Sequence, residues 1–232
     1  MKPREKKKKR GSKFLKWLLL YIPLWFVGLT VGWVVALKWV PVYFTPLMAV
    51  RTIENWGDSS FSTYKTWKPI ENISPNLARA VVASEDARFC SHNGFDWIEI
   101  DKAIKAHNKG KKLRGASTIS QQTAKNVFTF CSSTWARKGI ETYYTILIEW
   151  LWPKDRILEV YLNSIEMGPF IYGAEAVAKQ HFNKSAAQLT RSESALIAAT
   201  LPNPKRYSSK RPSNYMQRRR NEILGQMKRM GK

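Results

Sequence analysis

The sequence contains little cysteine, histidine or acidic side chain. Its 232 residues include two Cys, three His and 17 Asp or Glu, against 39 Lys or Arg. Two cysteines cannot build the dense disulfide framework of a small secreted domain, and Cys90-Ser91-His92 lacks the paired ligand spacing of a zinc site. We therefore expect no structural metal.

Long strand patterns and internal repeats are also missing. No extended run alternates apolar and polar residues, and no period of about 20–50 residues recurs, which argues against β-sandwiches, propellers and solenoids. Ser62 and Lys65 have the S-x-x-K spacing of penicillin-reactive enzymes, but neither S-D-N nor K-T-G follows them. We interpret that match as chance.

Positive charge is concentrated at the N-terminus. The formal net charge is +22, and residues 1–16 hold nine Lys or Arg against one Glu, about +8 of that total. Such a charge is typical of proteins that bind nucleic acid or an anionic membrane. Because this tail directly precedes a hydrophobic span, we expect the membrane bilayer as its partner, and no nucleic acid.

Residues 17–37 contain no charged side chain. At ~1.5 Å per residue they would span about 31 Å, the thickness of a bilayer core. We predict an uncleaved transmembrane signal-anchor helix. A cleaved signal peptide is the alternative, but its apolar core is normally only ~7–15 residues long. The positive-inside rule then keeps the tail in the cytoplasm and places everything after about residue 40 on the outer side.

Helix signals dominate the remaining chain, so we predict an all-α fold after the anchor. Ser74-Pro75 indicates an N-cap and first turn, and Thr190 with Glu193 forms a capping box ahead of a helix that Pro202 stops. Asp155 could cap a helix ending near Gly168. We divide the chain into a tail (1–16), an anchor (17–37), a membrane-proximal connector (38–64), a catalytic domain (65–208) and a basic C-terminal tail (209–232).

Other helices are predicted from apolar spacing. Residues 96–104 form a short amphipathic helix, and residues 109–114, rich in Lys and Gly, should be mobile. A helical stripe over 140–151 comprises Ile140, Tyr144, Leu147, Ile148 and Leu151.

Two polar runs contain the candidate chemistry. The first is 84–94 (SEDARFCSHNG) and the second is 115–128 (GASTISQQTAKNVF), which is dense in side chains that donate hydrogen bonds to phosphate and sugar oxygens. Glu85 continues the apolar stripe of Leu77, Ala80 and Val81 at helical spacing. A carboxylate on such a face is partly desolvated, which suits a general base.

These runs, together with 137–141 (RKGIE) and 157–163 (ILEVYLN), resemble the motifs of the peptidoglycan glycosyltransferases. The resemblance covers residues 65–208 and keeps the family's motif order. By length the chain is similar to the monofunctional members, which lack the transpeptidase domain of bifunctional penicillin-binding proteins. The resemblance implies a lysozyme-like, two-lobed α fold.

The implied activity is polymerisation of lipid II into glycan strands, with inversion at the anomeric carbon and release of polyprenyl diphosphate. The implied setting is the bacterial inner membrane, with one span, a cytoplasmic N-terminus and a periplasmic catalytic domain. The implied partners are lipid II, the growing lipid-linked glycan strand, the bilayer, and other cell-wall synthesis or division proteins.

Site roles follow from motif position. Glu85 is the expected base, and Glu141 is the second carboxylate of the family. A diphosphate is already a good leaving group and needs cations more than a proton donor, and the expected cations are Lys125, Arg137 and Lys138. Glu141 would position them or a divalent ion such as Mg²⁺, and no tightly bound cofactor is expected. Some members carry a basic residue where this chain has Ile140.

The remaining motif positions are assigned to the substrate wall, although His92 is explained equally well as a structural residue. For Arg137 and Lys138 substrate contact is favoured, and the alternative is ordinary surface charges. Glu149, Glu159 and Glu193 are interpreted as structural. The substrate-wall positions are Asp86, Phe89, His92, Gly94, Gly115, Ser117, Thr118, Gln121, Gln122 and Asn126.

Two further questions stay open on sequence alone. A disulfide between Cys90 and Cys131 would close a loop of about 40 residues, whereas the alternative is two separate buried thiols. The activity could instead be that of a lysozyme-type hydrolase or lytic transglycosylase, which also uses a Glu in a helical cleft, or the chain could be a non-catalytic cell-wall scaffold. The cations and the anchor favour synthesis.

Overall fold

The computed structural model describes residues 9–56, 62–110, 115–130 and 134–230, and for residues 9–16 it describes the backbone only. The chain divides into two units, Met1–Val40 and Pro41–Lys232. The first contains helix α1 (Lys9–Ala36), with Pro23 inside it. Within α1, Trp17–Ala36 has a mean hydropathy of 2.0 and is long enough to cross a membrane. Both a membrane anchor and a signal sequence have this character.

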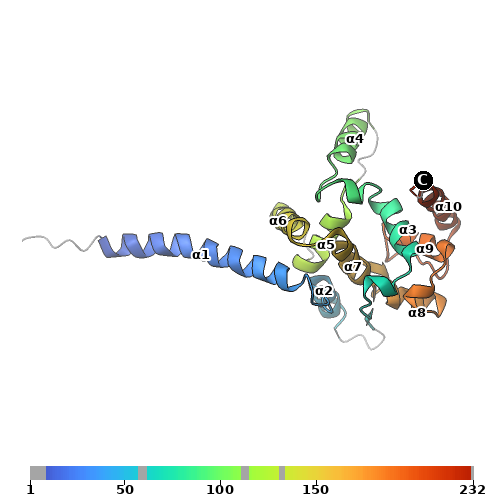
Figure 1. Ribbon diagram of the computed structural model, residues 1–232, viewed down its shortest axis with the longest axis horizontal. Helices are drawn as coiled ribbons and strands as arrows, with labels where there is room; N and C mark the ends of the chain where they lie inside the picture. Colours follow the sequence, from blue (N-terminus) through green and yellow to red (C-terminus); the bar gives the residue numbers. More distant parts are fainter. Residues whose placement is uncertain (1–8, 57–61, 111–114, 131–133, 231–232) are drawn as a thin grey trace, which may run out of the picture. The chain divides into compact units, whose positions relative to one another are not determined.

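The second unit is mostly helical, which confirms the predicted fold class (Figure 1). It also contains a small sheet in the order β1-β3-β2, in which β1 and β3 are parallel and β2 and β3 antiparallel. Its elements are α2 (Pro46–Glu54), β1 (Tyr64–Lys65), η1 (Ile70–Asn72), α3 (Pro75–Glu85), η2 (Phe89–Ser91), α4 (Trp97–Asn108), α5 (Ile119–Phe128), α6 (Trp135–Leu151), α7 (Lys154–Ser164), β2 (Glu166–Gly168), β3 (Ile171–Tyr172), α8 (Ala174–Phe182), η3 (Ala186–Gln188), α9 (Arg191–Thr200) and α10 (Asn214–Arg229).

Two groups of helices form the framework of the site. Helix α5 packs against α6 and α7, and α3 packs against α9 and α10 (Figure 1). The predicted start of α3 is confirmed, because the Ser74 hydroxyl accepts from the amide of Asn76 and donates to the carbonyl of Leu189 at 2.8 Å. The Thr190–Glu193 capping box of α9 is also confirmed. Local polar signals therefore located both helix starts correctly.

Three helix details differ from the predictions. Helix α7 starts at Lys154 after Pro153, so Asp155 lies in its first turn instead of capping it, and the helix ends at Ser164 before strand β2. In α6 the predicted stripe is wrong at Ile140, which is 48% exposed, whereas Glu141 is buried beside Thr145 and Ile148. Helix α4 runs to Asn108, past the predicted end at 104, and buries none of its side chains.

Within the C-terminal segment 209–232, which we predict as a basic tail, helix α10 packs onto the domain. Helix α10 buries Met216, Ile223 and Met227, residues at spacings of seven and four that form one helical face. This face lies against α9 and α3. Within the connector 38–64, helix α2 packs against α5. Both segments reach the candidate site from outside the predicted catalytic domain.

Candidate active site

Glu85 is the last residue of α3 and is half-buried. Its Oε2 accepts a hydrogen bond from Gln122 Nε2 at 3.0 Å, and the Ser84 hydroxyl lies 3.3 Å from its Oε1. The helix that ends at Glu85 and the helix that carries Gln122 are thus joined at the predicted base. Gln122 was predicted as a substrate contact, and in the structure its amide contacts the base directly.

Tyr161 fixes the orientation of that amide. The fully buried Tyr161 hydroxyl donates to Gln122 Oε1 at 3.1 Å. Burial, together with the carboxylates of Glu85 and Asp86, raises the pKa of Tyr161 well above its usual value, so the phenol remains a donor. Because Oε1 accepts from the phenol, the NH₂ group of Gln122 points at Glu85. In the sequence, Tyr161 belongs to the 157–163 motif, which gives no sign of this contact.

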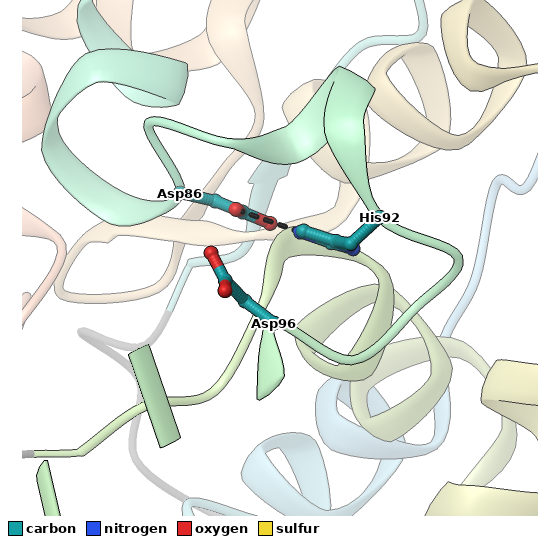
Figure 2. A group of neighbouring side chains, drawn as sticks. All are labelled: Asp86, His92 and Asp96. Carbon is teal, nitrogen blue, oxygen red and sulfur yellow. Dashed lines mark hydrogen bonds and ion pairs between the residues drawn. The ribbon is translucent and has the colours of Figure 1, made fainter. Parts of the chain in front are cut away.

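Asp86, His92 and Asp96 form a cluster next to the base (Figure 2), with ligand atoms within 4.8 Å of one another. Asp86 Oδ1 lies 2.9 Å from His92 Nε2, and Asp86 Oδ2 accepts from the backbone N–H of Ile119 at 3.0 Å. Asp96 Oδ1 caps α4, and its Oδ2 lies 3.1 Å from Arg88 Nε. Since each carboxylate oxygen already has a partner, we assign this cluster a structural role and no ion. It ties the loop after Glu85 to the start of α5.

Gly94, Thr118 and Gln121 build the start of α5. Thr118 is its N-cap and forms a capping box with Gln121, and the Thr118 hydroxyl donates to the carbonyl of Gly94 at 2.6 Å. Gly94 has φ +89°, and a Cβ there would lie 2.9 Å from Thr145 Cγ2. All three were predicted to line the substrate, whereas the structure uses their polar groups for backbone geometry. The capping-box spacing was visible in the sequence and went unrecognised.

Lys154 of α7 and Glu149 of α6 hold the loop that follows Glu85. Lys154 Nζ donates to Glu149 Oε1 at 2.8 Å and to the carbonyl of His92 at 2.7 Å, and lies 4.5 Å from the centre of the Phe89 ring. Ser120 also donates to Glu149 Oε1. Phe89, which we predicted as a substrate contact, is 2% exposed and belongs to the core. The loop that follows Glu85 is thus held by several helices.

Glu141 is 3% exposed and holds two cations. Arg137 NH1 lies 2.7 Å from its Oε2, and Lys138 Nζ contacts its Oε1. These contacts follow from the helical spacing of three and four residues. A buried carboxylate requires such partners, because removing an isolated charge from water is costly. Glu141 therefore holds the position of Arg137 and Lys138 at the start of α6.

A cavity of about 540 Å³ opens in front of Glu85, and we call it the glutamate cavity. From the predicted runs it is lined by Ser84, Glu85, Gly115, Ser117 and Gln122. Helix α10 supplies another part of the wall, and its lining residues are Tyr215, Arg218, Arg219, Glu222 and Gln226. A further cavity of about 390 Å³ runs from Glu85 along Glu99 and Lys102 of α4. The sequence gave no signal that α10 would reach the base.

A third cavity of about 670 Å³, which we call the cation cavity, is also lined by Gln122. Its wall includes Lys125, Asn126 and Arg137 from the predicted runs, with Arg51 of α2 and Glu166. Lys125 is exposed and has no ion-pair partner among the described residues. Burial lowers the pKa of Arg51, but the carboxylates of Glu54 and Glu166 more than offset this and leave it raised. The cavity thus carries more positive than negative charge.

The wall of the cation cavity is rich in donors and short of acceptors. Arg51 Nε, Asn126 Nδ2 and Arg137 Nε are buried and have no hydrogen-bond acceptor in the part of the chain that the structure describes. Buried N–H groups are normally paired, and leaving one unpaired costs about 1–3 kcal/mol. An anionic group with several oxygens has the chemistry that this wall lacks.

The predicted residues divide between the cavities and their supports. Those that line the glutamate cavity or the cation cavity are Glu85, Gly115, Ser117, Gln122, Lys125, Asn126 and Arg137. Asp86 and Thr118 line the cavity along α4, and those that line none of the three are Phe89, His92, Gly94, Gln121, Lys138 and Glu141. Cys90 is exposed and its thiol is free, whereas the sequence leaves open a disulfide with Cys131 or two separate buried thiols. The possible partner, Cys131, lies outside the described residues, as do 111–114 of the segment predicted to be mobile.

Comparison with known proteins agrees with this geometry. A family model described as Transglycosylase matches residues 51–228. The chain belongs to the transglycosylase family. The match includes Glu85, Gln122, Lys125 and Glu141, and it begins at Arg51, ahead of the catalytic domain predicted from the motifs. It also extends into α10.

Named relatives of this transglycosylase family cover most of the chain. A biosynthetic peptidoglycan transglycosylase of Bacteroides thetaiotaomicron is 54% identical over 87% of this chain and 82% of the relative. One of Bdellovibrio bacteriovorus is 47% identical over 94% and 87%, and one of Xanthomonas campestris is 45% identical over 96% and 91%. The similarity thus extends over nearly the full length of these relatives.

Proposed function

We propose that the protein is a monofunctional peptidoglycan glycosyltransferase that polymerises lipid II into glycan strands, with inversion at the anomeric carbon and release of polyprenyl diphosphate. The observation that carries the proposal is that two cavities share Gln122. The glutamate cavity contains a carboxylate, and the cation cavity contains Lys125 and Arg137. A sugar hydroxyl and a sugar diphosphate could therefore be held side by side.

The chemistry follows from this division. Glu85 takes the proton from the acceptor hydroxyl, and the hydroxyl oxygen forms the new bond to the anomeric carbon of the donor. The bond between that carbon and the diphosphate oxygen breaks on the opposite side, and its electron pair leaves with the diphosphate. Lys125 and Arg137 stabilise the charge that develops there. Attack opposite the leaving group converts an α-linked donor into a β-linkage.

The described residues do not favour a divalent ion at Glu141. Both of its carboxylate oxygens already contact cations, Arg137 and Lys138, and a metal would have to displace one of them. We therefore infer that Arg137 and Lys125, which line the cation cavity, supply the positive charge that Mg²⁺ would otherwise bring. No step above depends on a metal.

An exposed apolar face supports action on a lipid-linked substrate. On α6, Trp135, Ile146 and Trp150 are 93%, 55% and 77% exposed. At 100° per residue these positions fall within about 60° of one another, so they form one outward face. Large exposed apolar patches mark membrane or partner contacts. We infer that this face meets lipid, in a single-pass inner-membrane protein with a cytoplasmic N-terminus and a periplasmic catalytic unit, where other cell-wall synthesis or division proteins could join it.

The test compares the two carboxylates with lipid II as substrate. Glu85→Gln keeps the shape and removes the base, so polymerisation should fall by about 10²–10⁴-fold while binding of polyprenyl diphosphate stays close to wild type. Glu141→Gln should weaken that binding together with turnover, because it leaves Arg137 and Lys138 without their shared anchor. Glu71→Gln, at an exposed position on η1, is the matched control.

The outcomes also separate the alternative functions. A hydrolase would shorten pre-formed glycan and would not extend it from lipid II. A scaffold would bind cell-wall proteins without turnover. Wild-type polymerisation by Glu85→Gln would contradict the assignment of the base.

A further inference from the structure

Arg51 lies outside the predicted motifs, and the reaction proposed above gives it no role. It lies on α2, in the segment between the apolar helix and the catalytic motifs. The start of α2 is anchored in the domain, because Thr45 and Met48 are buried there and the Thr45 hydroxyl accepts from the amide of Met48. The helix packs against α5, which carries Lys125 and Asn126. Arg51 and Leu47, four residues apart, both line the cation cavity.

The partners of Arg51 within the chain do not explain this placement. Its NH1 lies 2.7 Å from Glu54 Oε2, but Glu54 is 50% exposed, and exposed ion pairs of this kind contribute little to stability. The nearby Glu166 already accepts from the backbone N–H of Phe170 at 3.2 Å. The Nε of Arg51 remains buried without an acceptor among the described residues. A planar guanidinium in this position suits recognition of phosphate oxygens.

We propose that Arg51 is a third cationic ligand of the donor diphosphate, together with Lys125 and Arg137, so that the membrane-proximal connector is part of the substrate site. The inference rests on the proposed function, because it assumes that the cation cavity receives a diphosphate. With Arg51 on α2, Lys125 on α5 and Arg137 on α6, three helices present one cation each. Such an arrangement favours a group with two phosphates over a group with one.

The experiment uses the full chain in detergent micelles and titrates it with polyprenyl diphosphate and, separately, with polyprenyl monophosphate. For Arg51→Ala we expect diphosphate affinity to fall about ten-fold or more, the loss typical of a charge-assisted hydrogen bond, and monophosphate affinity to fall by a clearly smaller factor. Arg51→Lys should recover part of the loss. Arg191→Ala, at an exposed arginine on α9 outside both cavities, should bind as wild type.

Glu54→Gln distinguishes a ligand from a structural ion pair. If Arg51 binds the diphosphate, removing its exposed partner should leave diphosphate affinity unchanged or increase it. If Arg51 only stabilises α2, Glu54→Gln should weaken binding as much as Arg51→Ala does. That result, or an Arg51→Ala affinity within two-fold of wild type, would overturn the inference.

Two provisions keep the test decisive. If Arg51→Ala fails to fold, as judged by thermal unfolding, Arg51→Gln replaces it, because it removes the charge and keeps most of the side-chain length. Wild-type discrimination between diphosphate and monophosphate in that variant would equally refute the proposal. A failure of the proposed function would be seen in a different measurement, because the wild-type protein would then not extend glycan from lipid II. The titrations measure the role of Arg51 independently of turnover.

Discussion

Replacing Tyr161 by Phe tests how the base is held. The substitution deletes one hydroxyl that is fully buried in α7 and donates to Gln122 Oε1 at 3.1 Å. Gln122 in turn donates to Glu85 at 3.0 Å. Without the phenol, no hydrogen bond from Tyr161 fixes which end of the Gln122 amide faces Glu85, and a rotated amide would direct its oxygen at the Glu85 carboxylate. Glu85 then accepts the hydrogen bond from Gln122 for a smaller fraction of the time.

The size of the effect follows from the contact that is lost. A neutral hydrogen bond contributes about 0.5–1.5 kcal/mol net, which corresponds to about 2- to 13-fold in rate. The repulsion between the rotated amide oxygen and the carboxylate still favours the native orientation, so we expect kcat to fall within that range with KM little changed. Water from the adjoining cavities can reach Gln122, so the free energy of unfolding should change by less than about 1 kcal/mol.

The assay is steady-state glycan polymerisation from lipid II across pH, with Tyr144→Phe as control. Tyr144 stacks on Phe128 with ring centres 4.3 Å apart and lines neither cavity. Because the pKa of Tyr161 is raised well above its usual value, the alkaline side of the profile should be the same in wild type and Tyr161→Phe. A kcat equal to that of wild type would show that the relay does not orient the base. A loss as large as that of Glu85→Gln would show that Tyr161 itself takes part in proton transfer.

Three further outcomes are expected from the structure. Gly94→Ala should lower the free energy of unfolding by about 2 kcal/mol or more, because residue 94 has a positive φ and its Cβ would meet Thr145 at 2.9 Å; an unchanged chemical denaturation curve would contradict this. Ile223→Ala should cost about 2–5 kcal/mol if α10 belongs to the core, and a cost near zero would restore the interpretation as a tail. Burial lowers the pKa of Lys65 from 10.5 to about 8, so between these pH values the unfolded chain binds more protons and the contribution of this residue to stability rises with pH. Between pH 8 and 10 the melting temperature of Lys65→Met should therefore rise less than that of wild type. An equal rise in both proteins would show that Lys65 does not cause the pH dependence of stability.

Local sequence signals predicted the framework well. The caps at Ser74 and Thr190 marked two helix starts correctly, and the chargeless run after the basic tail coincides with the apolar part of α1. The spacing of Arg137, Lys138 and Glu141 is sufficient to bring their charges together on one helix. Each of these features depends on residues within one or two helical turns, and the side-chain chemistry at that range is set by the sequence itself.

Long-range contacts decided the rest. The strands of the small sheet are two or three residues long and carry no readable period, so their pairing depends on helices that bring distant segments together. Gln122 meets Glu85 across 37 positions of the chain and Tyr161 across 39. Arg51 and α10 reach the site only because α2 packs on α5, and α10 on α3 and α9. A sequence pattern indicates which face of a helix is apolar but does not identify the helix against which that face will pack, because many partners bury a similar apolar area and the choice among them depends on the packing of the whole domain.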